Sequence, residues 1–145
     1  MELHAATFGE LDAATLYALL RLRVDVFVVE QQCAYPELDG RDTEPTATHL
    51  WLTADGDFAP LAYLRILTEP DGSARIGRVA VAPAARGAGL ARHLMEATLS
   101  RVGHRLCVLD AQANLVGFYR SLGFTVTGPE YLEDGIPHVP MRRST

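Results

Sequence analysis

The chain has 145 residues and a formal net charge of −5 at neutral pH, and all 13 of its basic residues are arginine. The absence of lysine excludes the enzyme classes whose chemistry needs that side chain, among them P-loop nucleotide-binding proteins, protein kinases and pyridoxal-phosphate enzymes. With 48% hydrophobic residues, a chain of this length is expected to fold as one domain, residues 1–145, that needs no disulfide or metal.

Location and partners can be judged from what the sequence lacks. Its N-terminus has no basic segment followed by an apolar one, and no run of about 20 apolar residues is present to cross a membrane. Its two cysteines, Cys33 and Cys107, form no Cys-x-x-Cys pair. We therefore expect a cytoplasmic protein without a membrane anchor, as a monomer or homodimer.

Charge is distributed unevenly along the chain. Residues 1–72 contain 13 acids and 4 arginines, whereas residues 73–145 contain 5 acids and 9 arginines. In one domain this asymmetry would let one region favour a cation and another an anion, and ordinary solvated surface charge is the alternative. No dense basic stripe exists, so nucleic-acid binding is not expected.

The first predicted elements are a short strand, a helix and a loop. The strand ends at Thr7 and Phe8, and Asp12 is placed to cap a helix that runs to about Val28. Residues 30–46 are polar, contain two prolines and are predicted to form a loop. Three- and four-residue spacing predicts that the buried face of the helix is formed by Leu16, Leu19, Leu20, Val24, Phe27 and Val28.

Strands and helices then alternate to the end of the chain. Strands are predicted over 49–53, 59–67 and 76–81, with turns at 55–57 and 70–72, before a helix that follows Pro83 and ends at Gly103. A buried strand over 106–109 precedes a helix from its expected cap Asn114 to Leu122. Closing strands are expected over 124–127 and 138–141. This order predicts an α/β or α+β sheet with helices on its faces.

The most informative segment is residues 79–91, a strand followed by a turn of small residues and a helix start. Small side chains let backbone N–H groups at a helix N-terminus approach an anion, and Arg86 adds a cation. This chemistry suits a pyrophosphate. A dinucleotide-binding G-x-G-x-x-G turn would need a third glycine and an acidic partner, both missing here, and a turn whose small residues serve only packing is a further alternative.

Residues 86–91 match the Gln/Arg-x-x-Gly-x-Gly/Ala acetyl-CoA loop of the GNAT N-acetyltransferases, and the chain resembles that family. A second family element stands at Asn114 and at residues 118–124, where the tyrosine, here Tyr119, commonly acts as general acid near the CoA sulfur. The resemblance implies the GNAT acyl-CoA N-acyltransferase fold, a mostly antiparallel twisted sheet flanked by helices. It also implies that acetyl-CoA is bound by Val79, Ala80, Val81, Arg86, Gly87, Ala88, Gly89, Leu90, Ala91, Asn114, Phe118 and Tyr119.

The resemblance extends over essentially the whole chain and is most specific for the ElaA-like branch of the family. It includes residues 16–31, the segment 39–42 and the phrase from Glu133 to His138, and it departs at Ala34, where proline is expected. The acceptor of this branch is poorly defined. The resemblance therefore implies the cofactor more firmly than the substrate.

An N-acetyltransferase must remove a proton from its amine acceptor, because alkyl amines with a pKa near 10.4 are protonated at neutral pH. We predict His138 as the base and His49 as the second candidate, since histidine titrates near neutrality. A cationic amine would be received by the acidic loop. The residues expected to contact the acceptor are Glu30, Tyr35, Asp39, Asp42, His49 and Asp134.

Several alternatives stay open on the residues alone. The chain could be a non-catalytic acyl-CoA sensor, a transferase for hydroxyl acceptors or longer acyl chains, or a structural domain. No histidine pair or His/Cys cluster has metal-ligand spacing, so no metal is expected. Neither cysteine lies in a Cys/His motif, so we expect direct transfer without an acyl-enzyme.

Overall fold

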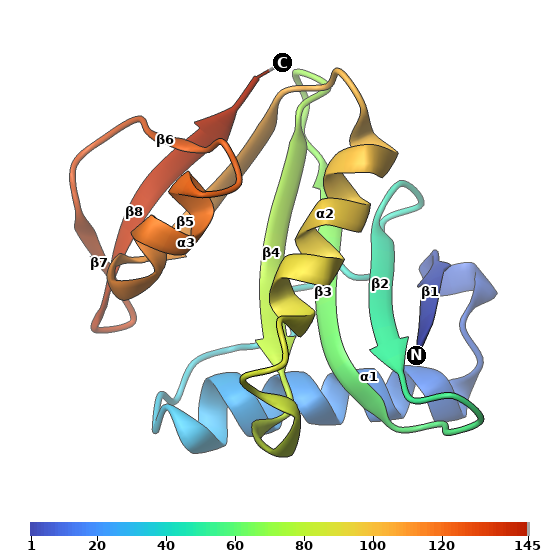
Figure 1. Ribbon diagram of the computed structural model, residues 1–145. Helices are drawn as coiled ribbons and strands as arrows, with labels where there is room; N and C mark the ends of the chain where they lie inside the picture. The colour runs from blue at the N-terminus through green and yellow to red at the C-terminus, as the bar shows by residue number, and fades with distance from the viewer. Residues whose placement is uncertain (145) are drawn as a thin grey trace.

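One twisted sheet holds all eight strands found in residues 1–144, the part of the chain that the computed structural model describes (Figure 1). The strand order is β1-β2-β3-β4-β5-β8-β6, and β7 pairs with β8. The strands are β1 (Glu2–Ala6), β2 (Thr48–Thr53), β3 (Pro60–Thr68), β4 (Ala74–Val81), β5 (Cys107–Gln112), β6 (Thr125–Val126), β7 (Tyr131–Glu133) and β8 (Ile136–Arg143).

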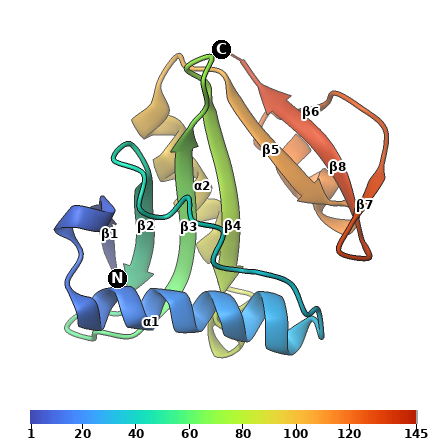
Figure 2. The ribbon, with the colours of Figure 1, turned by 180° about the vertical axis from the view of Figure 1, so that it is seen from behind.

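Helices cover both faces of the sheet. The long helices are α1 (Ala13–Val24), which continues as the π-helix η2 (Asp25–Glu30), and α2 (Leu90–Val102), and a short α3 spans Val116–Arg120. Single 3₁₀ turns are η1 (Phe8–Glu10), η3 (Pro83–Ala85) and η4 (Ala113–Leu115). Helices α2 and α3 lie on one face and α1 crosses the other (Figures 1 and 2). This arrangement confirms the mixed α/β fold predicted from the element order.

Strands β4 and β5 form the one parallel pair in this sheet, and they separate after a short contact. Their register includes only Ala74 with Cys107 and Arg75 with Val108. Beyond Arg75, β4 therefore has a strand partner on the β3 side alone. Figure 1 shows the two strands opening toward the end of the sheet that α1 crosses. In the second half of β4, the backbone N–H and C=O groups on the β5 side therefore have no strand to pair with.

Two apolar cores hold these layers together. The larger one fills the space between the sheet and helices α2 and α3, and it includes Leu64, Leu94 and Phe124. The smaller one lies under α1 and includes Leu19, Trp51 and Tyr63. Because β4 contributes Ile76 to the first core and Ala80 to the second, this strand is packed from both sides. Packing on both faces therefore holds β4 in place where it separates from β5.

The predicted buried face of the first helix was wrong in part. Leu19 is buried as expected, but the other buried positions of α1 and η2 are Leu22, Arg23 and Val26. Apolar spacing could not show this, because an arginine occupies the centre of the buried face. Asp12 does cap the helix, where its side chain accepts a hydrogen bond from the Thr15 N–H at 2.8 Å.

Two predictions near the C-terminus also need correction, and one strand there was missed. Asn114 is not a helix cap, because it lies inside η4 and α3 begins only after Leu115, without a side-chain cap. The last strand is longer than predicted, since β8 spans Ile136–Arg143. Strand β7 was not predicted at all, because Glu130–Glu133 shows no alternation of apolar and polar residues.

A buried ionic network joins α1, the loop 31–47 and the sheet. Arg23 is 1% exposed and donates from Nε to Glu37 at 2.7 Å and from Nη1 to Asp42 at 2.6 Å. Arg65 on β3 binds the same Asp42 at 3.0 Å and Asp39 at 2.8 Å. Buried charges are tolerated only when paired and hydrogen-bonded in this way. The network therefore fixes the loop against the sheet.

Arg78 completes this network from a strained position in β4. Its φ of 55° lies in the left-handed region, which is uncommon for residues other than glycine. The register between β3 and β4 shifts between Tyr63 and Arg65, as expected when one extra residue bulges out of β4. Arg78 donates to Glu37 at 2.9 Å. The bulge thus turns a strand residue toward the loop.

His49 lies in the same buried region and is neutral. Its Nε2 lies 3.1 Å from the Asp42 carbonyl oxygen, which can only accept, so Nε2 carries the proton and Nδ1 accepts from the Tyr63 hydroxyl at 2.6 Å. Burial lowers the pKa of His49 from its ordinary value. Protonation would place a positive charge among arginines. His49 is therefore a buried histidine that holds Tyr63 and the Asp42 backbone by hydrogen bonds.

Breaking the network at its centre should destabilise the fold. Arg23→Met leaves Glu37 and Asp42 buried without their cation, and we expect the free energy of unfolding to fall by about 3–5 kcal/mol in urea titrations. Arg21→Met is the matched control, because the Arg21 side chain is 75% exposed and its ion pair with Asp25 measures 3.8 Å. A control loss equal to that of Arg23→Met would contradict this role.

The neutral state of His49 predicts how stability depends on pH. The unfolded chain binds a proton at His49 below about pH 6.5, whereas the folded chain does so only at lower pH. Folding stability should therefore fall as the pH drops from 7.5 to 5.5. Urea unfolding at both values should show a smaller difference for His49→Gln, while His93→Gln on the exposed surface of α2 should keep the full difference.

Candidate active site

A cleft of about 920 Å³ occupies the opening between β4 and β5. Its walls come from η2, the loop after it, strands β3 to β5, helix α3 and the β7–β8 hairpin. These elements lie far apart in the sequence and meet only because β4 and β5 diverge (Figure 1). A cleft of this size whose lining combines apolar and convergent polar side chains is a typical ligand site.

The free edge of β4, with Val79, Ala80 and Val81, forms one wall of the cleft. The Ala82 N–H donates to the Leu61 carbonyl at 2.8 Å, and Ala62 lies opposite Val81. In this antiparallel pattern the N–H and C=O of Val81 itself point away from β3. They face the cleft, where the carbonyl accepts a hydrogen bond from Arg86 Nε at 3.2 Å and the N–H is left for an extended chain with amide groups.

The turn after β4 leaves the N-terminus of helix α2 uncapped and accessible, as an anion site requires. Gly87 and Gly89 have φ values of 85° and 74°, which favour glycine, and no side chain caps the helix that begins at Leu90. A Cβ built at either glycine meets no atom within 4 Å, so the space beside the turn is open. The first-turn N–H groups, which include those of Leu90 and Ala91, are free to bind an anion. Ala88, between the two glycines, is exposed.

Arg86 is turned toward the mouth of the cleft instead of the start of α2. Its Nη2 lies 2.6 Å from the Glu30 carboxylate, and its Nε donates to the Val81 carbonyl at 3.2 Å. Both residues line the cleft. Glu30, predicted to bind the acceptor, therefore already has a cationic partner, and Arg86 already has an anionic one.

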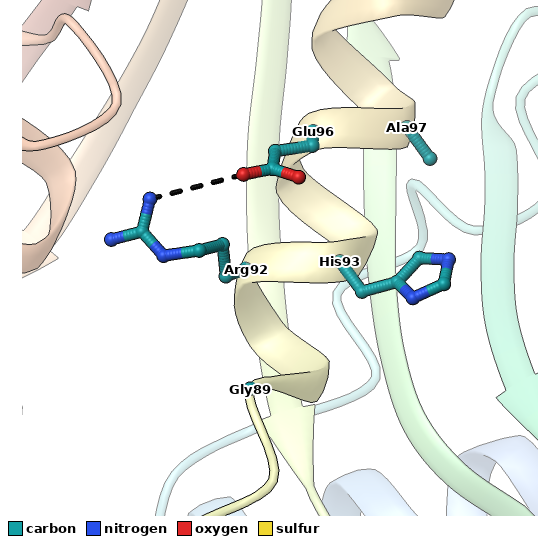
Figure 3. A pocket seen from close by; sticks show the side chains of 5 residues that line it. All are labelled: Gly89, Arg92, His93, Glu96 and Ala97. Atoms are coloured by element: carbon teal, nitrogen blue, oxygen red, sulfur yellow. Dashed lines mark ion pairs between the residues drawn. The ribbon is translucent and has the colours of Figure 1, made fainter.

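A second arginine, which sequence reasoning missed, lies between α2 and α3. Arg92 donates to Ser121 Oγ at 2.6 Å, and its guanidinium stacks over the Phe118 ring at 5.4 Å. Arg92 also forms an ion pair with Glu96, whose carboxylate oxygen lies 3.9 Å from Arg92 Nη1 (Figure 3). Both residues line a shallow hollow of about 370 Å³ on α2 that begins at Gly89. The place of Arg92 directly after Ala91 in the loop motif was the available signal.

Tyr119 presents a free hydroxyl on the α3 side of the cleft. Its ring is 6% exposed and packs edge-on against Phe118 and Phe124. Within residues 1–144 its hydroxyl has no hydrogen-bond partner, and it lines the cleft. Burial raises the pKa of Tyr119 to about 12, so the group is protonated at neutral pH and can donate. Asn114 does not line the cleft.

His138 lies on β8, next to the cleft-lining Gln112 of β5 in the strand register. Its Nδ1 lies 2.7 Å from the Ile136 carbonyl oxygen, so Nδ1 carries the proton in the neutral ring. The lone pair of Nε2 is then available, with Glu133 at 3.9 Å. The ring stacks on Tyr131 and lines the cleft. This tautomer is the one that a general base needs.

The acidic loop is mostly neutralised by arginine. Tyr35 and Asp39 line the cleft, but the Tyr35 hydroxyl donates to Glu37 and Asp39 binds Arg65 and Arg78. Burial opposes ionisation of Asp39, yet the hydrogen bond and charge of Arg65 hold its pKa well below the usual range. Asp42 and His49, also predicted acceptor contacts, lie in the core and outside the cleft lining.

The β7–β8 hairpin carries the carboxylates that have no arginine partner among the described residues of the cleft. Asp134 has a φ of 51° in the turn, is exposed, and its carboxylate makes no ion pair in residues 1–144. The one basic side chain near the Glu133 carboxylate there is His138, at 3.9 Å, and the two form an ion pair only when the imidazole carries a second proton. The backbone carbonyl of Asp134 accepts a hydrogen bond from the Cys33 thiol at 3.4 Å. The hairpin is thus tied to the loop across the cleft.

Residues 20–145 match the family model described as the acetyltransferase (GNAT) domain. The chain belongs to the GNAT acetyltransferase family. This GNAT domain is 50% identical over 138 residues to a UPF0039 protein of Mycobacterium tuberculosis, covering 92% of this chain and 87% of that protein. It is 42% identical over 141 residues to the protein ElaA of Escherichia coli, covering 93% and 91% of the two chains.

Solved structures agree with this assignment. The GNAT domain superimposes on an acyl-CoA N-acyltransferase from Pseudomonas aeruginosa with a TM-score of 0.91 and 43% identity, covering 99% of both chains. The resemblance to the ElaA-like branch of the GNAT family is therefore confirmed, as is the mostly antiparallel fold. No helix in residues 1–144 is long and apolar enough to cross a membrane. No metal-binding group of three or more His, Cys, Asp or Glu side chains forms there either.

Proposed function

We propose that this protein is an N-acetyltransferase that moves the acetyl group of acetyl-CoA directly to a primary amine. The observation that carries the proposal is that two groups without a hydrogen-bond partner in residues 1–144 line the same cleft: the Tyr119 hydroxyl on α3 and Nε2 of His138 on β8. An acid and a base of this kind are what amine acylation requires. The open helix start at Gly89 supplies the third part, an anion site.

The cleft has the features that coenzyme A needs. The first-turn N–H groups of α2 would hold the pyrophosphate, and the free edge of β4 at Val81 would pair with the amides of the pantetheine arm. The Phe118 ring and the small side chain of Ala91 offer apolar contact. When bound, acetyl-CoA supplies the electrophilic thioester carbon. Nothing else in the proposed reaction has to come from outside except the amine.

The two proton transfers of the reaction are assigned to His138 and Tyr119. His138 accepts a proton from the acceptor nitrogen, whose lone pair forms the new C–N bond. Tyr119 donates its proton, or a hydrogen bond, to the sulfur as the C–S bond breaks. A β4 backbone N–H such as that of Val81 would stabilise the oxyanion, and one such donor is worth about 3–4 kcal/mol.

The amine is expected to arrive at the β7–β8 hairpin. Glu133 and Asp134 carry negative charge beside His138 without a neutralising arginine, so they would attract a cation. This differs from the acidic loop that the sequence suggested, whose carboxylates largely hold arginines. A small amine, a polyamine and a peptide amine all satisfy this chemistry.

Direct transfer is favoured over an acyl-enzyme. Cys33 and Cys107 are both buried, and burial raises the pKa of the Cys107 thiol. A buried, protonated thiol is a poor nucleophile. We expect steady-state kinetics with a ternary complex, and the resting protein should carry no trapped acyl group.

Tyr119→Phe should lower kcat roughly 100-fold while leaving CoA affinity unchanged, because it removes a proton donor from an otherwise retained ring. Thiol release from acetyl-CoA across a panel of amines, including polyamines and peptides with free N-termini, would measure it. Tyr17→Phe on the exposed surface of α1 is the control. Tight binding of acetyl-CoA without turnover of any amine would favour a sensor instead. Turnover of hydroxyl acceptors or longer acyl chains would support the other acyltransferase alternatives.

Gly89→Ala should weaken CoA binding, since the added methyl group enters the open space beside the phosphate turn and the residue has a positive φ. Gly103→Ala at the other end of α2 is the matched control, because it also has a positive φ and open space. Gly89→Ala should lose about 1–2 kcal/mol of folding stability and Gly103→Ala, whose ψ of −123° lies outside the left-handed region, at least as much. Calorimetric titration should show lost CoA affinity for Gly89→Ala alone. Equal CoA affinity in both would contradict this phosphate site.

A further inference from the structure

An ion pair between Glu30 and Arg86 lies in the lining of the cleft, beside the turn that would hold the cofactor's phosphates. Glu30 is the last residue of η2, and Arg86 lies in the turn before α2, 56 positions later. Their side chains are 41% and 42% exposed, and the carboxylate and guanidinium meet through two hydrogen bonds. The pair thus joins the end of η2 to the turn before α2.

The π-helix orients Glu30 toward this partner. In η2 the chain forms wider turns, and the Cys33 N–H donates to the carbonyl of Val28, five residues earlier, at 3.1 Å. A π turn adds one residue to the helical turn and so rotates the residues after it. Such turns interrupt α-helices at functional sites more often than elsewhere. Here the turn places a carboxylate at the cleft.

Arg86 has little binding capacity left for a phosphate in this state. Three of the five N–H donors of a guanidinium are engaged, two with Glu30 and one with the Val81 carbonyl. The carboxylate also cancels the positive charge. An arginine at this motif position would otherwise add attraction for a pyrophosphate to that of the α2 N-terminus.

We propose that Glu30 competes with the phosphates of coenzyme A for Arg86 and so sets the affinity for the cofactor. This inference rests on the proposed function, since it assumes that coenzyme A enters the cleft. On binding, the pyrophosphate replaces the Glu30 carboxylate on Arg86, and the end of η2 is released from the phosphate turn. Glu30 is a positioning residue in this scheme and takes no part in the chemistry.

Removing the charge of Glu30 tests the competition. In calorimetric titrations at low salt, Glu30→Gln should bind CoA roughly two- to fivefold more tightly than the wild type, the range expected for an exposed ion pair. Pantetheine, which lacks the phosphates, should bind both proteins equally. The gain should shrink as salt is added, because a freed Arg86 is screened, and it should vanish in an Arg86→Ala background.

Asp25→Asn is the matched control, since it removes the same charge from the start of η2, where Asp25 faces Arg21 at 3.8 Å. It should leave CoA affinity unchanged. The inference is overturned if Glu30→Gln binds CoA no more tightly, if Asp25→Asn gives the same gain, or if the gain persists with Arg86→Ala. Failure of the wild type to bind CoA would overturn the proposed function and this inference together. CoA binding without turnover would leave the inference standing.

Discussion

Burial of Arg23 in the last turn of helix α1 is the constraint on which the architecture depends. The guanidinium is 1% exposed, and its binding to Glu37 and Asp42 pulls the loop 31–47 against the sheet. Arg65 and Arg78 share these carboxylates, so α1, the loop, β3 and β4 are held in one network. The floor and one wall of the cleft are therefore positioned by charge pairing, in addition to apolar packing.

The bulge at Arg78 connects this network to the site. It turns a strand residue toward Glu37, and it lies in the strand whose other edge β5 leaves after Arg75. A strand packed by two cores but paired on one side alone is rigid and still has free backbone groups. An extended chain can pair with the free Val81 N–H at once, whereas the Val81 carbonyl first has to release the Arg86 Nε–H. The opening between the strands is thus a stable feature of the fold.

The use of arginine in place of lysine throughout the chain suits this network of buried and cleft-lining ion pairs. A guanidinium offers five donors in a planar fork, so Arg23 can bind two carboxylates at once and Arg86 can hold Glu30 through two bonds. A lysine ammonium is a compact charge that would satisfy fewer fixed partners when buried. The same property leaves the acidic loop nearly neutral. The cleft consequently has its available negative charge on the β7–β8 hairpin, beside the proposed base.

The sequence by itself determined the family and the mixed fold, and it predicted a phosphate turn at Gly87–Ala91 and roles for Tyr119 and His138, because these depend on local spacing and small residues. The tertiary structure decided which charges are free. Arg23 interrupts the apolar face predicted for its helix, and Asp42 and His49 lie in the core, because their partners come from segments distant in the chain. Glu30 and Arg86 are 56 residues apart, and no local pattern predicts that they meet. Long-range ion pairing depends on how the layers pack, which only the folded chain establishes.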